Sequence, residues 1–158
     1  MLDTKLMKSG DAISASLAEL FVTIDGQRYN IIQLIKFEAK FTKKKVEIPI
    51  MGKTGKGHKA AGWSGTGSAT LHYNTSVFRE AAQRYKETGE DVYYEAQLTN
   101  EDPSSSIGRQ TVILKDLNFD ELILAKADAT ADYLDEDMGF TFDDFEIPEK
   151  FNLVSGMV

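Results

Sequence analysis

Residues 36–74 read KFEAKFTKKKVEIPIM (36–51), GKTGKGHKAAG (52–62) and WSGTGSATLHYN (63–74). The two outer segments alternate apolar and polar residues, which is typical of β-strands. The segment between them holds four glycines in eleven residues, and glycine leaves the backbone free to adopt positive φ. The pattern predicts two strands joined by a hairpin or loop that projects over about residues 43–62. The alternative interpretation is an ordinary disordered surface loop.

The alternation changes phase inside the first of these strands. Three lysines interrupt the alternation after Thr42. The apolar residues before them stand at odd-numbered positions, and those after them stand at even-numbered positions: Val46, Ile48 and Ile50. A phase shift of this kind indicates a bulge, a twist or a hairpin that leaves the body of the domain. Pro49 has no N–H to donate to a β-ladder, so this end of the strand is expected at a sheet edge.

The hairpin is cationic although the chain carries a net charge of -7. Residues 36–59 contain eight lysines and two acids, whereas residues 128–149 contain nine acids and no lysine or arginine. Segments of opposite charge on one chain complement a second copy placed head to tail. The residues expected at such intersubunit contacts are Lys43, Lys44, Lys45, Lys53, Lys56, Lys59, Trp63, Asp135 and Asp137. The alternatives are a solvated acidic surface and, for the lysines, a phosphate or nucleic-acid partner.

The remaining pattern predicts a mainly β fold with one helix. Strand-like runs occupy residues 19–25 and 28–37, and apolar residues at helical spacing predict a helix over 75–88 that ends at Gly89. Further strand-like runs follow at residues 92–99, 110–117, 118–126 and 138–147. A chain of 158 residues suits a single domain over 1–158, with a flexible N-terminal arm at about 1–16.

Composition argues against membrane insertion, secretion and disulfide bonds. The chain has no cysteine, and no stretch approaches the roughly 20 apolar residues of a membrane span. Residues 1–15 lack the apolar core of a signal peptide, so a reducing, aqueous compartment is expected.

Sites for enzyme chemistry, metals and cofactors are also not expected. Gly52 and Gly57 have the spacing of a phosphate-binding loop, but His58 stands where the lysine is required. With no cysteine and two histidines, the chain has no metal-site pattern. Asp135, Asp137 and Gly139 fail the calcium-loop spacing because Leu134 occupies the first ligand position. We therefore expect no catalytic, cofactor-binding or metal-binding residues.

The run GWSGTGSATL at residues 62–71, the helix start TSVFR at 75–79 and the antiparallel strands after it occur in a distinctive order. This order resembles the tail tube proteins of contractile-tailed phages, defective prophages and phage-tail-like bacteriocins, over nearly the whole chain. The resemblance implies a β-sandwich or partial barrel with one flanking α-helix. It also implies self-assembly into stacked hexameric rings that form the inner conduit of a contractile tail, within a virion tail or tail-like particle built in the host cytoplasm. The implied partners are further copies of the chain and the sheath, baseplate or tube-initiator and tape-measure proteins.

In such a tube, one face of the returning strand is expected to line the lumen. The small hydroxyl side chains of Ser64, Thr66, Ser68 and Thr70 share that face. A channel without a cluster of cationic side chains to bind the phosphates would let DNA pass without specific binding. Two other function classes stay open: a nucleic-acid-binding module that uses the lysines with Trp63 and Tyr73, although the sequence pI is near 4.9, and a small-ligand-binding β-barrel.

Overall fold

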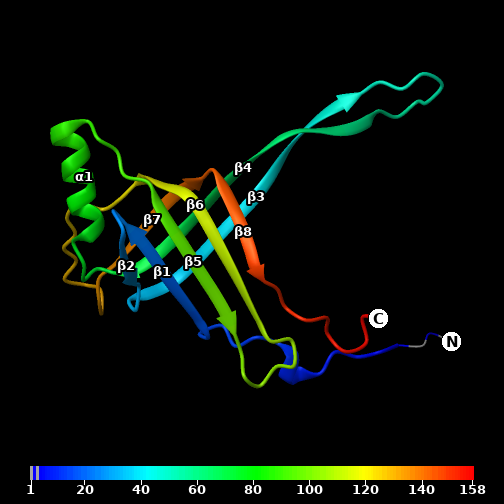
Figure 1. The fold of residues 1–158 in the computed structure, drawn as a ribbon, viewed down its shortest axis with the longest axis horizontal. Coiled ribbons are helices and arrows are strands. Elements are labelled where there is room, and N and C mark those ends of the chain that lie inside the picture. Colours follow the sequence, from blue (N-terminus) through cyan, green and yellow to red (C-terminus); the bar gives the residue numbers. More distant parts are fainter. Residues whose placement is uncertain (1, 3) are drawn as a thin grey trace. The chain divides into compact units, whose positions relative to one another are not determined.

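The computed structural model describes residue 2 and residues 4–158. Figure 1 shows the mainly β fold with one helix and a long projecting hairpin, which confirms the predicted class. The strands are β1 (Ala18–Ile24), β2 (Gln27–Asn30), β3 (Leu34–Ile48), β4 (Gly57–His72), β5 (Tyr94–Glu101), β6 (Arg109–Glu121), β7 (Asp135–Phe142) and β8 (Asp144–Glu149). The helix is α1 (Val77–Thr88), and a 3-10 turn, η1, covers Ser9–Asp11. No helix in this part of the chain is long and apolar enough to cross a membrane.

The chain divides into two compact units, and the predicted single domain over 1–158 stays a prediction. The first unit comprises the described residues of Met1–Ile32 together with Tyr94–Lys115 and Phe145–Val158. Its strands follow the order β2-β1-β5-β6, and β8 pairs with β6. Its buried apolar side chains include Leu20, Val22, Ile24, Ala96 and Leu114.

A two-residue turn joins β1 to β2. Asp25 and Gly26 both have positive φ, at 50° and 80°, and the residues that flank them, Ile24 and Gln27, are directly paired. Positive φ at both central residues is the geometry of the tight hairpin turn that Asp-Gly favours. The turn connects the strand-like runs expected at 19–25 and 28–37, and the second run is divided between β2 and the start of β3.

The second unit comprises Gln33–Tyr93 and Asp116–Asp144. Strand β6 is divided between the units after Lys115, and the strand order of the second unit is β6-β7-β4-β3. The largest fully buried side chains of this unit include Phe140, Leu71, Leu117 and Met138. The strands predicted at 110–117 and 118–126 are one strand, β6, because Asp116 adopts a φ of 53° and kinks it without ending it. The strand predicted at 138–147 is instead two, β7 and β8, separated at Asp143.

Helix α1 packs its apolar stripe inside the second unit. Phe78 is buried and meets Phe119 of β6 edge to face, with ring centroids 5.1 Å apart. The helix ends at Gly89, whose φ is 74° and whose N–H donates to the Tyr85 carbonyl at 2.8 Å. The predicted helix over 75–88 is confirmed to within two residues.

An ion pair fixes the start of α1 to β7. Arg79 Nη1 lies 2.6 Å from Glu136 Oε2, and the Glu136 side chain is 1% exposed. Arg79 also donates to the carbonyls of Ile123 and Thr75, and its guanidinium lies 4.3 Å from the centre of the Tyr73 ring. Glu136 is therefore a buried member of the segment that the sequence indicates as acidic surface.

The predicted arm at 1–16 falls partly on residues 1 and 3, which lie outside the described residues. Within the described part, the Asp11 carboxylate accepts hydrogen bonds from the Ser106 N–H at 3.0 Å and its hydroxyl at 2.8 Å. The Ser14 N–H donates to Asp102 at 2.9 Å. These bonds hold the pKa values of Asp11 and Asp102 below their usual range. The flexibility of the arm stays a prediction.

Candidate functional site

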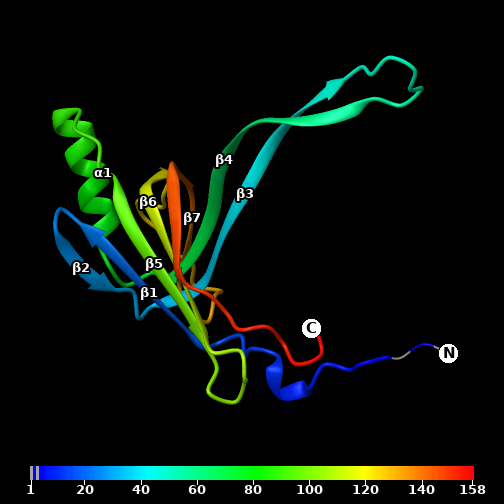
Figure 2. The same ribbon diagram turned by 45° about the vertical axis from the view of Figure 1, so that its right-hand side comes forward.

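Strands β3 and β4 form a long antiparallel hairpin (Figure 2). Pairing runs from Leu34 opposite Leu71 out to Ile48 opposite Gly57. The segment predicted to project, 43–62, is therefore mostly β-strand, and only residues 49–56 lie outside the two strands. From residue 40 to residue 62 every side chain is exposed apart from the half-buried position 57. The hairpin presents both of its faces to solvent here.

A bulge interrupts the hairpin where the sequence changes phase. Lys43 pairs with Trp63 and Lys45 with Ala60, so Lys44 stands opposite both Ala61 and Gly62. Gly62 has a φ of 110°, which a residue with a Cβ rarely adopts. Of the three causes expected for the phase shift, namely a bulge, a twist or a departing hairpin, the pairing shows a bulge. Because side chains alternate along β3, Val46 and Ile48 lie on the opposite strand face from Phe41.

Aromatic side chains surround the hairpin at its base. The Phe41 and Trp63 rings stack with centroids 5.0 Å apart, and Trp63 lies 6.3 Å from Phe142 of β7. Gly65 and Gly67 leave space for the rings of β7: a Cβ at Gly65 would lie 2.4 Å from Phe142, and one at Gly67 would lie 2.4 Å from Phe140. This packing gives a physical role to both glycines of the Gly-Thr-Gly run.

The hydroxyl residues predicted to line a lumen share one face of β4. Ser64, Thr66 and Ser68 are exposed, and Thr70 is half-buried. Residues paired directly across two antiparallel strands share a face, so three charged residues of β3 join them. These are Lys40 opposite Thr66, Glu38 opposite Ser68 and Lys36 opposite Thr70. The face is thus both charged and hydroxylated.

The two acids predicted at intersubunit contacts also lie on this face. Asp137 is paired with Thr70, whose hydroxyl donates to the carboxylate at 2.7 Å. Asp135 is paired with His72 and forms an ion pair with Lys126 at 3.0 Å. The structure therefore brings the predicted acidic contacts together with the predicted lumen residues, which sequence reasoning treated as separate sets.

The predicted lysine contacts gather along the hairpin, and most have no counter-ion among the described residues. Lys56 lies 3.5 Å from Glu47, which makes it the one ion-paired member of the set. The other five form no ion pair with any residue that the structure describes: Lys43, Lys44, Lys45, Lys53 and Lys59. Their charges are free to interact with another molecule.

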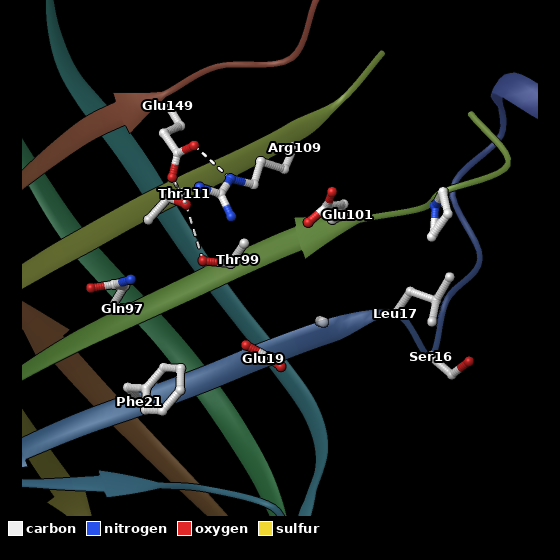
Figure 3. Close-up of a pocket in the computed structure, with 12 residues that line it drawn as sticks. Ser16, Leu17, Glu19, Phe21, Gln97, Thr99, Glu101, Arg109, Thr111 and Glu149 are labelled. Atoms are coloured by element: carbon white, nitrogen blue, oxygen red, sulfur yellow. Dashed lines mark hydrogen bonds and ion pairs between the residues drawn. The ribbon is translucent and has the colours of Figure 1, made fainter. Parts of the chain in front are cut away.

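Sequence reasoning missed a groove on the first unit (Figure 3). It has a volume of about 480 Å³ and lies over β1, β5, β6 and β8. Arg109 Nε lies 2.5 Å from Glu149 Oε2, and the hydroxyl of Thr111 donates to Glu149 Oε1 at 3.1 Å. The bond to Arg109 lowers the pKa of Glu149, and the same bond raises the pKa of Arg109. No local pattern signals this site, because its residues come from distant parts of the chain.

No group of three or more histidine or acidic side chains is placed to hold a metal ion in residue 2 or residues 4–158.

Known proteins resemble this chain over most of its length. The phage-like element PBSX protein XkdM of Bacillus subtilis (strain 168) is 38% identical over 146 residues, which cover 92% of this chain and 97% of that protein. The anti-feeding prophage baseplate structure, which is 6-fold symmetrised, contains a chain with a TM-score of 0.66 and 10% identity, covering 86% of this chain and 95% of that one.

A sheath/tube terminator structure of an extracellular contractile injection system, in its extended state, has a TM-score of 0.64 and 10% identity. The match covers 87% of this chain and 97% of that one. At such low identity the two structures show a shared fold.

A family model described as phage tail tube protein matches residues 5–149. This match spans both compact units and every strand of the fold. The chain therefore belongs to the phage tail tube protein family.

Proposed function

We propose that six copies of this tail tube subunit close into a ring and that the rings stack into the inner conduit of a contractile tail. The observation that carries the proposal is the hairpin, where four large apolar side chains stay substantially exposed to solvent. These are Val46 and Ile48 at 38%, Ile50 at 47% and Met51 at 101% exposure. A monomeric protein seldom leaves an apolar strip of this kind in water, so burial against another subunit accounts for it.

Open strand edges supply the second support for ring formation. Within the second unit β3 is the last strand in the order, and within the first unit β2 is the last, so each has one side without a partner among the described strands. Unpaired strand edges favour pairing with another chain. A ring that closes strand to strand removes these edges. The 6-fold symmetrised structure that shares the fold makes six the ring size to test.

We assign the hairpin to contacts between neighbouring subunits or rings, with its unpaired lysines facing acidic surface on the neighbour. Deletion of residues 52–62 removes exposed residues and one half-buried glycine, so the variant is expected to fold as a monomer and form no tubes. Circular dichroism checks the fold, and electron microscopy checks assembly. Tubes of normal length from this variant would contradict the assignment.

We assign the face of Ser64, Thr66, Ser68 and Thr70 to the lumen. The mixed charges of Lys36, Glu38 and Lys40 on the same face offer DNA no continuous cationic track. Lysines placed by Thr66→Lys and Ser68→Lys should react slowly with a bulky amine reagent in intact tubes and rapidly in unassembled protein. Rapid labelling in both states would show that the face points outward.

The further partners in this proposal are the sheath, the baseplate or tube initiator and the tape-measure protein, and the location is a virion tail or tail-like particle assembled in the host cytoplasm. The proposed role is structural, with no catalytic step. The chain is proposed to act as one tail tube domain.

Electron microscopy of the concentrated wild-type protein tests the central proposal. Rings or hollow rods are expected to appear as the concentration is raised, and their end-on views should show sixfold symmetry. A protein that stays monomeric at every concentration and ionic strength, with no ring or rod visible, would overturn the proposal.

A further inference from the structure

The groove on the first unit carries interleaved apolar and acidic side chains. Leu17 and Phe21 of the β1 region and Pro103 after β5 supply apolar surface, while Glu19 and Glu101 supply exposed carboxylates. Figure 3 shows Leu17, Glu19 and Phe21 following one another along the β1 side, with Glu101 at the end of β5. The groove is therefore suited to a segment that is apolar and cationic.

The charge of the groove is only partly neutralised from within. Its one lining cation, Arg109, is bonded to Glu149, which also accepts from Thr111, and the charge of Arg109 also acts on Glu101. The guanidinium of Arg28 lies 4.0 Å from the centre of the Phe21 ring and covers part of that apolar surface. Glu19 and Glu101 form no ion pair with any described residue, so both carboxylates stay available for a further cation.

The tip of the β3–β4 hairpin has the complementary chemistry. Ile50 is 47% exposed and Met51 is 101% exposed, so the described residues cover about half of the first side chain and none of the second. Lys53 and Lys59 carry charges that no described residue neutralises. The tip thus offers an apolar contact surface with cationic groups at its edge, and this combination complements the apolar and acidic residues of the groove.

We propose that this groove receives the tip of the β3–β4 hairpin from a second copy of the chain, with Ile50 and Met51 against Leu17 and Phe21 and the lysines beside Glu19 and Glu101. Because the groove and the tip are different surfaces, the contact is heterologous and repeats from copy to copy. The inference rests on the proposed tube function and names the receiving surface for its hairpin.

Charge reversal tests the pairing. The variant Glu19→Lys/Glu101→Lys places like charges opposite the hairpin, so the critical concentration for tube assembly is expected to rise about tenfold or more. Adding Lys53→Glu/Lys59→Glu on the hairpin should restore assembly toward the wild-type value. Lys56 is left unchanged because it is paired with Glu47. The control Glu90→Lys changes an exposed acid after α1 and should leave the critical concentration unchanged.

Disulfide cross-linking locates the contact. The chain has no cysteine, so engineered thiols have no background. In tubes of a Ser16→Cys/Thr54→Cys variant, oxidation should link copies into a ladder on a denaturing gel, because residue 16 borders the groove and residue 54 lies in the tip. The matched Ser76→Cys/Thr54→Cys variant should give no ladder. A link within single chains, or a ladder from the matched variant alone, would overturn the inference.

The two levels of the proposal fail in different ways. If the wild-type protein forms no tubes under any condition, the tube function fails and the groove inference fails with it. If the wild type forms tubes and the reversed-groove variant assembles equally well, the groove inference alone is wrong. Failure of the compensating hairpin reversal to restore assembly would likewise contradict the pairing while leaving the tube function intact.

Discussion

Gly67 lies where β4 passes closest to its neighbours. A Cβ at this position would stand 2.3 Å from the Glu38 carbonyl oxygen, and that backbone atom cannot rotate away. We expect Gly67→Ala to lower the free energy of unfolding by about 1–3 kcal/mol, the usual cost of overpacking. Gly65→Ala should cost less, because the nearest atoms to a Cβ there belong to the Phe142 ring, a side chain that can shift, and not to the backbone. Urea denaturation of the unassembled protein followed by circular dichroism measures both.

The matched control is Gly139→Ala in β7. A Cβ there would meet only a carboxylate oxygen of Asp120 at 3.8 Å, an ordinary contact distance, so little change in stability is expected. Equal stability of the Gly67→Ala and Gly139→Ala variants would show that close approach at Gly67 is not what requires a glycine.

Arg79 and Glu136 form the second feature at the scale of single residues. Arg79→Ala leaves the buried Glu136 carboxylate without its counter-ion, so the free energy of unfolding should fall by about 3–5 kcal/mol. Replacing both partners, as in Arg79→Met/Glu136→Leu, should recover most of that loss, because a well-packed apolar pair avoids burying charge. Lys86→Ala on the exposed part of α1 serves as the control. A double variant no more stable than Arg79→Ala would indicate that the guanidinium acts through its bonds to the Ile123 and Thr75 carbonyls.

At the scale of elements, the turn η1 is fastened to the loop between β5 and β6 by carboxylates. The lowered pKa values of Asp11 and Asp102 mean that the folded state binds fewer protons than the unfolded state in acid. Their stabilisation is therefore complete above the unfolded aspartate pKa of about 3.9 and is lost as pH falls through the lower folded values.

We expect Asp11→Asn/Asp102→Asn to reduce stability at neutral pH and to flatten the dependence of stability on pH below about 4, where these two aspartates bind fewer protons in the folded state than in the unfolded state. Urea denaturation at a series of pH values measures this slope, and Glu90→Gln, which changes an exposed acid, should keep the wild-type slope. A variant with the wild-type slope would show that other carboxylates govern acid unfolding.

Local sequence patterns predicted the elements better than their connections. The helix could be predicted because the spacing of its apolar residues and the glycine that ends it, Gly89, are local signals. The bulge could be expected because the alternation of apolar and polar residues changes phase at Lys43–Lys45. The kink at Asp116 left no such signal, because a left-handed aspartate leaves the apolar run around it intact. Glu136 looked like surface since its partner is 57 residues away. The groove was missed for the same reason: Glu19, Glu101 and Glu149 meet only in the folded unit.

At the scale of the whole molecule, two electrostatic effects oppose each other during assembly. The net charge of -7 makes copies repel, and salt weakens that repulsion. Contacts between hairpin lysines and a neighbour's carboxylates attract, and salt weakens these as well. The Debye length falls from about 10 Å at 0.1 M to about 3 Å at 1 M. The repulsion is spread over charges that are far apart and is already screened at 0.1 M, so loss of the short-range contacts should dominate above that concentration.

Tube assembly is therefore expected to weaken as NaCl rises from 0.1 M to 1 M. Two lysine contacts worth about 0.2–1 kcal/mol each would change the contact equilibrium by roughly 2-fold to 30-fold. A Lys53→Gln/Lys59→Gln variant should assemble poorly at 0.1 M and respond little to added salt. Ile50→Ser/Met51→Ser removes exposed apolar surface instead, and it should weaken assembly at both salt concentrations because hydrophobic contact is not screened. Sedimentation of tubes across the salt series separates the two. Unchanged wild-type tube mass over the whole range would mean that apolar contact alone holds the copies together.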